Sequence, residues 1–414
     1  MNFVLSLTIY TYAVLISASE TTTNEDIGKP APRTIRAAEY PDLQSAFNAL
    51  PESGGSIQLP AGSFELEQPL VIHTENTLLV GQGPATHLIN MNEQGQPAII
   101  LRPQNRMTDQ TARIWRVQLE NFRISGNPKS GDGILAEGIN ELSIHGLSID
   151  HNGGHGINMI DCYEDPRIAH CLLTYNGFAG LNIRSGHDII VSGNQFEENQ
   201  DALRCIDSFN LCMNGNNLDD HLRHGIVIEN TYGSVLSGNM IEECIGTAVI
   251  LDRDCYGITI SSNVIAHELA GGVDLRDAWG CTISGNTFTI VHQFGVRVGK
   301  NSGRIAISGN NFTNSHIGNG TRRIAKEDSN PFRLDVGSGV QLMETADVVV
   351  SGNVFTGMSR SGISADNKCR RLLISNNLFF DLNRRTPEPG RPLQVPSHNS
   401  HLIKNNLIPE TSPR

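Results

Sequence analysis

Short runs of alternating apolar and polar residues recur along the chain, and most contain the same polar turn. The run has the form Ile-Ser-Gly-Asn-x-Phe, and variants of it occur nine times. A fixed period of 22 to 24 residues between most copies indicates a solenoid, in which each repeat buries its apolar face against its neighbours. The aligned asparagines are Asn194, Asn216, Asn239, Asn263, Asn286, Asn310, Asn353, Asn377 and Asn406.

A second apolar run precedes the asparagine phrase in each repeat, as in GINMI at Gly156, GIVIE at Gly225 and GVDLR at Gly272. Alternating branched residues bounded by Gly and Asn turns favour strands over helices. Stacked coils place equivalent residues about 4.8 Å apart. An inward asparagine in every coil can therefore pass an amide hydrogen bond to the next one.

These repeats resemble the right-handed parallel β-helix of the pectate-lyase-like (pectin lyase fold) superfamily. The resemblance implies an all-β fold, a single solenoid of about ten coils between Ile100 and Ile408. The stretch from Tyr40 to Gly83 resembles the N-terminal module of those proteins. There Asp42 is expected to cap a short helix that ends by Pro51 and covers the open bottom of the coil.

The ends of the chain differ from the repeats. Residues 1–19 are mostly apolar and close with small residues, which predicts a secretory signal peptide rather than a membrane span. Residues 20–38 are expected to be a linker, 39–408 the β-helix domain with an insertion loop at 317–337, and 409–414 a tail. We therefore expect a secreted or periplasmic protein, monomeric and without a membrane span.

The eight cysteines form no CxxC pair and no zinc spacing. Cys205 takes an inward apolar position and Cys171 an asparagine position, which favours buried structural thiols, with one or two disulfides left open. A net charge of −12 argues against nucleic acid as a partner. It does not exclude acidic sugars, because a groove on an acidic protein can be basic.

Carboxylates gather on the outer face of the strands that begin with the second run. Glu229 and Asp252 are expected to be neighbours at one strand spacing, with Asp274 diagonally across. Like charges push one pKa upward, as a general acid requires. Carboxyl pairs about 5–9 Å apart also serve glycoside hydrolysis. These three residues are the leading catalytic candidates.

Basic residues flank the carboxylates, and we expect them to hold substrate carboxylates or sulfates. They are Arg184, Arg204, Arg276, Arg297 and Lys300. The simpler interpretation is an ion-pair ladder in which Asp274 lies beneath Arg297 and Asp252 beneath Arg276. Such pairs would keep an exposed sheet soluble, each contributing about 0–1 kcal/mol.

A reserve acid–base pair lies where each coil enters these strands. Asp201 and His224 occupy stacked positions, in the contexts NQDAL and RHGI. This is similar to polygalacturonases, whose successive coils carry an NTDG segment, a paired-Asp segment and a GHG segment. Here NGFAG at Asn176 has no Asp, and only Asp201 of the doublet is present.

The run from HGIVIEN at His224 to GVRVGKN at Gly295 is also similar to the sugar-binding β-helix of mannuronan C5-epimerases. The DPHD segment of that family corresponds here to Arg204–Asp207, in which only Asp207 matches the pattern.

These observations predict a secreted carbohydrate-active enzyme on a uronic-acid-containing or sulfated polysaccharide, acting by lyase or glycoside hydrolase chemistry. An elimination requires both a neutralised carboxylate and a base. Two alternatives stay open: a non-catalytic glycan-binding or surface structural protein, and a uronan C5-epimerase-like enzyme. No cofactor is expected. The acidic columns would suit Ca²⁺, but no ligand spacing demands a metal.

Overall fold

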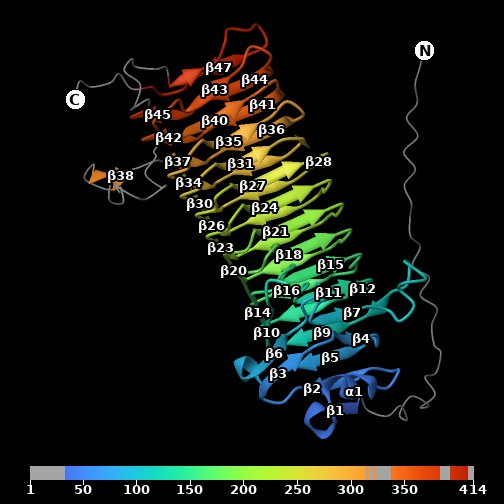
Figure 1. Cartoon of the computed structure of the whole chain (residues 1–414). Coiled ribbons are helices and arrows are strands. Elements are labelled where there is room, and N and C mark those ends of the chain that lie inside the picture. The colour runs from blue at the N-terminus through green and yellow to red at the C-terminus, as the bar shows by residue number, and fades with distance from the viewer. Residues whose placement is uncertain (1–32, 314–315, 318–320, 323–336, 383–391, 409–414) are drawn as a thin grey trace, which may run out of the picture.

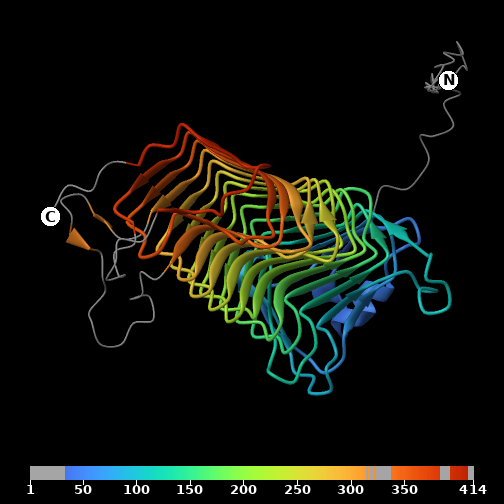
Figure 2. The ribbon, with the colours of Figure 1, turned by 90° about the horizontal axis from the view of Figure 1, so that it is seen from above.

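The computed structural model is an elongated solenoid, which confirms the expected all-β parallel β-helix. The structure describes residues 33–313, 316–317, 321–322, 337–382 and 392–408. Figure 1 shows the strands stacked along one axis, and Figure 2, turned by 90°, shows the coils following a common path. Three parallel sheets, called A, B and C here, form the walls of the coil.

Sheet A contains 17 strands and collects the first half of each asparagine phrase. Its strands are β1 (Arg33–Arg36), β2 (Gly55–Gln58), β5 (Thr77–Val80), β9 (Val117–Glu120), β13 (Ser143–His145), β16 (Arg167–Ala169), β19 (Ile190–Ser192), β22 (Cys212–Asn214), β25 (Val235–Ser237), β28 (Cys255–Tyr256), β29 (Thr259–Ser261), β32 (Ala278–Trp279), β33 (Thr282–Ser284), β36 (Gly303–Ser308), β41 (Ala346–Ser351), β44 (Arg370–Ser375) and β47 (Leu402–Lys404).

Sheet B contains 13 strands and follows the asparagine turn. Its strands are β3 (Gly62–Leu66), β6 (Thr86–Asn90), β10 (Arg123–Ser125), β14 (Ser148–Asp150), β17 (Leu172–Thr174), β20 (Gln195–Glu197), β23 (Asn217–Asp219), β26 (Met240–Glu242), β30 (Val264–Ala266), β34 (Thr287–Thr289), β37 (Asn311–Thr313), β42 (Val354–Thr356) and β45 (Leu378–Phe380).

Sheet C also contains 13 strands and carries the second apolar run of each repeat. Its strands are β4 (Leu70–Ile72), β7 (Ile99–Leu101), β11 (Ile134–Glu137), β15 (Ile157–Ile160), β18 (Ala179–Arg184), β21 (Asp201–Ile206), β24 (His224–Glu229), β27 (Thr247–Asp252), β31 (Gly271–Leu275), β35 (Phe294–Val298), β40 (Ser338–Leu342), β43 (Ile363–Ala365) and β46 (Leu393–Gln394).

Few described elements lie outside these sheets. Two short pairs are parallel β8 (Ile114–Trp115) with β12 (Ile139–Asn140) and antiparallel β38 (His316–Ile317) with β39 (Thr321–Arg322). The helices are α1 (Leu43–Asn48), η1 (Ala37–Glu39) and η2 (Gly83–Ala85). In the part of the chain that the structure describes, no helix is long and apolar enough to cross a membrane.

The asparagine ladder forms at the turn between sheets A and B, as predicted. The Asn216 side chain donates to Asn239 Oδ1 at 2.9 Å and to the carbonyl of Val191 at 3.1 Å, and the Asn216 amide also donates to Asn239 Oδ1. The same contacts join Asn239 to Asn263. Because the asparagines are buried, the ladder satisfies polar groups that would otherwise face the apolar interior.

A second inward column lies at the turn between sheets B and C, and here the residue type changes along the axis. Asn152, Asn176 and Asn199 form a shorter amide ladder. In the next coils the column continues with His221, Cys244 and Glu268, as the backbone bonds between consecutive turns show. These three side chains are almost completely buried. The sequence analysis did not identify this column.

All eight cysteines are free thiols, which answers the question that their spacing left open. Cys205 and Cys171 are buried, and burial raises the pKa of the Cys205 thiol to about 12 and that of Cys171 to about 11. The Cys171 amide donates to Asn194 Oδ1, so this residue does occupy an asparagine position. Protonated, buried thiols of this kind are inert.

The N-terminal coils correct the expected extent of the solenoid. With 13 strands in sheets B and C, it has more turns than the ten expected from Ile100 onward. Residues 33–36, which were expected to be part of a linker, pair with Gly55–Gln58 of sheet A. The early coils were missed because their turns lack the asparagine phrase. The capping helix is confirmed: Asp42 accepts a hydrogen bond from the Ser45 amide at the start of α1.

Three predicted segments lie wholly or largely outside the described residues. They are the signal peptide at 1–19, most of the insertion at 317–337, and the tail at 409–414.

Candidate active site on sheet C

The parallel register of sheet C brings the predicted site residues together as the sequence indicated. Asp201 pairs with His224, and Glu229 pairs with Asp252 in the next coil. Asp274 lies in register with Ile250 on one side and Arg297 on the other, which places it diagonally across from Asp252. The candidates therefore share one face of the solenoid.

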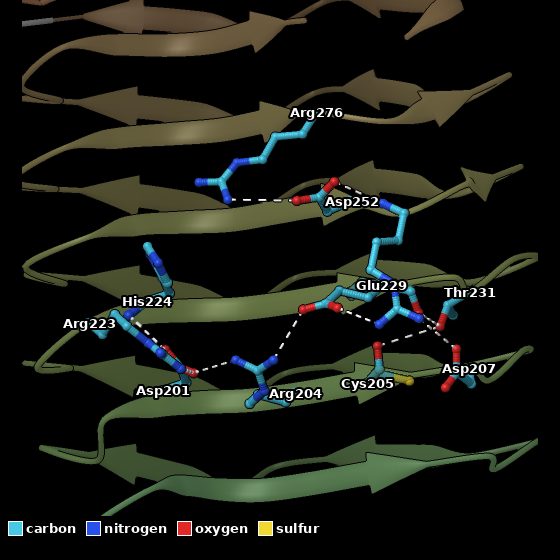
Figure 3. A network of polar contacts seen from close by, with 12 residues as sticks. Asp201, Arg204, Cys205, Asp207, Arg223, His224, Glu229, Thr231, Asp252 and Arg276 are labelled. Carbon is cyan, nitrogen blue, oxygen red and sulfur yellow. Dashed lines mark hydrogen bonds and ion pairs between the residues drawn. The ribbon is translucent and has the colours of Figure 1, made fainter. Parts of the chain in front are cut away.

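Six charged side chains form a continuous chain of ion pairs across this face, which we call the charged chain. Acidic and basic residues alternate along it. Figure 3 shows Arg204 lying between Asp201 and Glu229, with Asp207 at the far end. In order, its members are Arg223, Asp201, Arg204, Glu229, Arg253 and Asp207.

Asp201 is the buried anchor of the charged chain. Its Oδ1 accepts hydrogen bonds from Arg223 Nε at 2.8 Å and from the His224 amide at 3.0 Å, and its Oδ2 accepts from Arg223 and Arg204. Burial alone would raise the pKa of Asp201, but the Arg223 hydrogen bond and charge outweigh it and lower the pKa. A carboxylate with four donors already in place is a positioning group rather than a free base.

His224 contacts Asp201 through its backbone and not through its ring. Its Nδ1 accepts the Thr247 amide at 3.0 Å, so the neutral ring carries its hydrogen on Nε2. Burial lowers the pKa of His224, which keeps this form at neutral pH. A ring fixed in this way donates a hydrogen bond from Nε2 and does not serve as a general base at that atom.

Each of the leading carboxylates has an arginine beside it. Glu229 accepts from Arg204 at 3.1 Å and from Arg253 at 2.8 Å. Arg276 contacts both remaining carboxylates, with Nε 3.0 Å from Asp274 Oδ2 and a guanidinium nitrogen 3.8 Å from Asp252 Oδ2. The like charges of Glu229 and Asp252 are therefore compensated, a feature that strand spacing alone did not reveal.

The middle of the face is covered, which corrects the expectation of exposed columns. Val227 and Ile250 point outward in sheet C but are only 5% and 2% exposed. Figure 3 shows Arg204 and Arg276 extended along the face instead of away from it. The guanidinium heads reach the carboxylates of neighbouring coils. The outer face here is therefore a row of charged side chains above a buried apolar layer.

The remaining predicted cations fall into two groups. Arg184 and Lys300 are exposed, and neither forms an ion pair with any described residue. Arg297 is the register partner of Asp274 in the next strand, but the two side chains form no ion pair. The Arg297 guanidinium instead lies over the Phe294 ring, 3.7 Å from its centroid, and donates a hydrogen bond to Gln341. Burial lowers the pKa of Arg297, although it remains charged.

Two arginines of the charged chain were not among the sequence-predicted site residues. Arg223 reaches Asp201 because the turn before His224 is one residue longer than the turn before Asp201. Arg253 directly follows β27 and extends back over two coils to Asp207. The sequence did contain a signal for each: Arg223 directly precedes His224 in RHGI, and Arg253 is a charged residue at the end of its strand.

One cluster among the described residues has the composition of a metal site, and it lies outside the charged chain. Glu242, Glu243 and His267 each offer one ligand atom, and these atoms lie within 4.8 Å of one another. The three residues lie at the C-terminal ends of β26 and β30 in sheet B. The His267 ring contacts Glu242 at 2.7 Å. Burial and the neighbouring Asp220 raise the pKa of Glu243 to about 7.

No curated protein matches the chain in sequence. Solved structures with a similar fold agree with the architecture described above. The A-module of the Azotobacter vinelandii mannuronan C-5 epimerase AlgE4 superposes with a TM-score of 0.57 at 14% identity, covering 90% of this chain and 100% of that one. A bacteriophage CBA120 tailspike protein gives 0.61 at 11% identity, covering 92% of this chain and 62% of that one. DFA-IIIase from Arthrobacter chlorophenolicus A6 gives 0.57 at 14% identity, covering 83% and 94%.

Similarity at such low identity concerns the fold alone. The sequence itself matches the family described as "Right handed beta helix region" over residues 107–265 and 236–410, which together cover most of the chain. With the parallel sheets and the asparagine ladder, this match shows that the chain belongs to the right-handed β-helix family.

Proposed function

We propose that this protein is a carbohydrate-active enzyme that cleaves an acidic polysaccharide on the outer face of sheet C. The observation that carries the proposal is the pair Glu229 and Asp252, held in register on neighbouring strands beside three arginines. Carboxylates and guanidinium groups fixed side by side can supply both proton transfer and anion binding, as cleavage of an acidic polysaccharide requires. The structurally similar proteins include epimerases named for mannuronan and alginate, which supports a polysaccharide substrate.

Asp252 is the best candidate for proton transfer. Its side chain is 35% exposed, against 18% for Glu229 and 7% for Asp274, and its ion pair with Arg276 is the longest of the group. A substrate carboxylate that drew Arg276 toward itself would free Asp252 to act as a base. Elimination needs this base and a neutralising cation, and hydrolysis would use Asp252 with Glu229.

Anion binding is assigned to the cations that form no ion pair with a carboxylate in the described part of the chain. Arg184 and Arg297 lie on β18 and β35, at opposite ends of the charged region. Guanidinium groups bind carboxylates and sulfates in two-point contacts, which suits a uronic or sulfated glycan. Lys300 extends this set at the turn after β35.

The test is a panel of uronic and sulfated polysaccharides incubated with the full chain. Lyase activity would give an unsaturated uronide that absorbs at short ultraviolet wavelengths, and hydrolysis would give new reducing ends without this absorbance. Inversion at C5, detected by proton NMR without chain cleavage, would support the epimerase alternative, which the AlgE4 likeness keeps in view. Absence of all three signals on every polymer would overturn the enzyme proposal.

A non-catalytic glycan-binding protein is the second candidate. It is favoured by the compensation of Asp201, Glu229, Asp252 and Asp274 by arginines, as expected of a stable ion-pair ladder. Retention of the protein on an immobilised polysaccharide without turnover would identify it.

We also propose export to the periplasm or the extracellular space. The thiols are free, seven of the eight are buried and the eighth, Cys212, is half-buried, so an oxidising compartment would find few accessible groups to couple. Fractionation of cells that express the full chain, followed by N-terminal sequencing, checks this. An intact N-terminus in the cytoplasmic fraction would contradict it.

A further inference from the structure

The hydrogen-bond arrangement of Asp201 and His224 occurs a second time on sheet C. Asp132 Oδ1 accepts the His155 amide at 2.7 Å, as Asp201 Oδ1 accepts the His224 amide. The His155 ring accepts the Ala179 amide at Nδ1, 3.1 Å away, as His224 accepts that of Thr247. The two units are separated by three steps along the sheet, from β11 through β15 and β18 to β21.

The two units differ in what surrounds the aspartate. Asp201 is held by two arginines, whereas Asp132 Oδ2 accepts the side-chain amide of Asn158 at 2.9 Å. Asn158 Oδ1 in turn accepts the amide of Asn182 at 2.9 Å. Around Asp132, side-chain amides take the place of the Arg204 and Arg223 guanidinium groups that surround Asp201 three coils away. The side chains that hold Asp132 and Asn158 are thus amides and not cations.

The groups that this second unit offers to a ligand are a ring donor and an aromatic face. With Nδ1 occupied, the neutral His155 ring carries its hydrogen on Nε2. Burial is the largest influence on His155 and lowers its pKa, so the ring stays neutral near pH 7. Beside it lies Phe178, 52% exposed, with its ring centroid 5.5 Å from that of His155.

This combination suits an uncharged pyranose. The C–H face of a sugar ring packs on an exposed aromatic ring, and its hydroxyl groups pair with fixed donors and amides. A uronate would gain less here than on the charged face, since the Asp132 carboxylate is nearby and Arg204 and Arg223 are already paired.

We propose that His155, Phe178 and Asn158 form a subsite for a neutral sugar unit, and that the natural glycan contains both neutral and acidic units. This rests on the proposed function, because the acidic units would occupy the charged face, where anion binding is proposed for Arg184, Arg297 and Lys300. Phe178 lies one coil below the turn that leads to Asp201, so the subsite and the charged chain are adjacent. One or two coils correspond to about 5–10 Å along the axis, within the span of one short oligosaccharide.

The experiment is a glycan array probed with the full chain, printed with three groups of oligosaccharides: purely uronic, purely neutral hexose, and alternating uronic and neutral units. Dissociation constants for one purely uronic and one alternating oligosaccharide are then measured by calorimetry. The variants are Phe178→Ala and His155→Asn. The asparagine keeps an acceptor for the Ala179 amide, near the position of His155 Nδ1, and removes the Nε2 donor. Phe380→Ala is the matched control, because Phe380 is 59% exposed and lies on sheet B.

We expect the wild type to bind alternating oligosaccharides more tightly than purely uronic ones. Phe178→Ala and His155→Asn should each weaken binding of the alternating oligosaccharide at least about tenfold. Both should leave binding of the uronic one within about twofold, and Phe380→Ala should change neither. Thermal unfolding of each variant verifies that the coil remains intact.

Two results overturn the inference in different ways. If the wild type binds acidic oligosaccharides and Phe178→Ala leaves both dissociation constants unchanged, the subsite is refuted while the proposed function stands. If the wild type binds and turns over no acidic glycan at all, the proposed function fails and the subsite fails with it.

Discussion

Single asparagines carry much of the specificity of this fold. From Asn194 to Asn377 each one is buried and makes hydrogen bonds to the coils on both sides, so its amide has no equally good position elsewhere. This is why the ladder could be predicted from the sequence: a polar residue repeated at a buried position must be satisfied by its own copies.

Asn239→Ala should therefore destabilise the protein strongly. The change removes bonds to Asn263 and Met213 and leaves the Asn216 amide and side chain without their acceptor. Buried donors left unpaired cost about 1–3 kcal/mol each, so a loss of about 2–4 kcal/mol is expected in urea unfolding. Asn214→Ala, at an exposed position in the preceding coil, should cost about 0.5 kcal/mol or less. Equal losses for both variants would contradict the ladder's role.

The buried column of His221, Cys244 and Glu268 makes a pH-dependent prediction. Neither carboxylate oxygen of Glu268 has a hydrogen-bond partner. Burial raises the pKa of Glu268 well above the ordinary 4.5; the neighbouring Cys244 opposes this shift, and the charges of Glu242 and Glu243 add to it. The folded state holds this proton and the unfolded state releases it, so Glu268 lowers stability progressively as pH rises above 4.5.

Glu268→Gln should remove this dependence. The variant is expected to unfold at nearly the wild-type temperature at pH 4 and at a higher temperature than wild type at pH 8, measured by calorimetry. Glu65→Gln, at an exposed position on sheet B, controls for loss of one carboxylate and should follow the wild-type curve. A Glu268→Gln variant whose difference from wild type is the same at both pH values would contradict the prediction, because it would mean that folding does not raise the pKa of Glu268.

The sheet-C strands show how far pattern alone can reach. Their register was predicted correctly for Glu229 with Asp252 and for Asp201 with His224, because the asparagine ladder fixes every coil relative to the next. The side-chain directions were not predictable in the same way. Arg276 and Arg204 have several rotatable bonds, and only the positions of the carboxylates decide that they lie along the face.

Conservative changes of the three leading carboxylates test whether these residues are catalytic or only form ion pairs that keep the sheet soluble. Given a substrate, Asp252→Asn or Glu229→Gln should reduce turnover at least about 10²-fold while the protein stays folded. Asp274→Asn is expected to act through Arg276, mainly by raising KM. Glu65→Gln serves again as the control. Wild-type rates for all three variants would move the reaction to another part of the surface.

Asp201→Asn should act on stability and not on chemistry directly. Removing the charge leaves Arg223 and Arg204 without their buried partner, at a cost of about 3 kcal/mol or more near neutral pH. The pKa of Asp201 is lowered on folding, so its contribution is present above 3.8 and is lost as pH falls through the folded value. Urea unfolding at pH 7 and pH 3 should show the gap between variant and wild type shrinking in acid.

At the scale of the whole molecule, the coil is the unit of structure. Ala278 and Ser302 occupy equivalent turns, as the bond from the Ala278 amide to Ser302 Oγ shows. Deleting residues 278–301 joins equivalent points and removes one coil. We expect this variant to keep a β-type circular dichroism spectrum and to unfold cooperatively, because each coil depends mainly on its neighbours.

Deleting residues 278–289 is the matched control for that experiment. This half-coil deletion removes two strands of sheet A and one of sheet B but leaves the sheet-C strand of the same coil. The remaining strands could then no longer all pair in their native sheets. It should aggregate or fail to fold. If both deletions fold equally well, the register would be far looser than the ladders indicate.

The asparagine ladder also has a direction. Each side chain accepts through its oxygen from the coil before it and donates through its nitrogen to the coil after it, as Asn239 does between Asn216 and Asn263. The amide dipoles therefore add along the axis, and hydrogen bonds arranged in this way strengthen one another. A coil that has just been synthesised meets a donor already pointing toward it. The solenoid is thus suited to assembly in the order in which a ribosome releases the chain, with each finished turn serving as the template for the next.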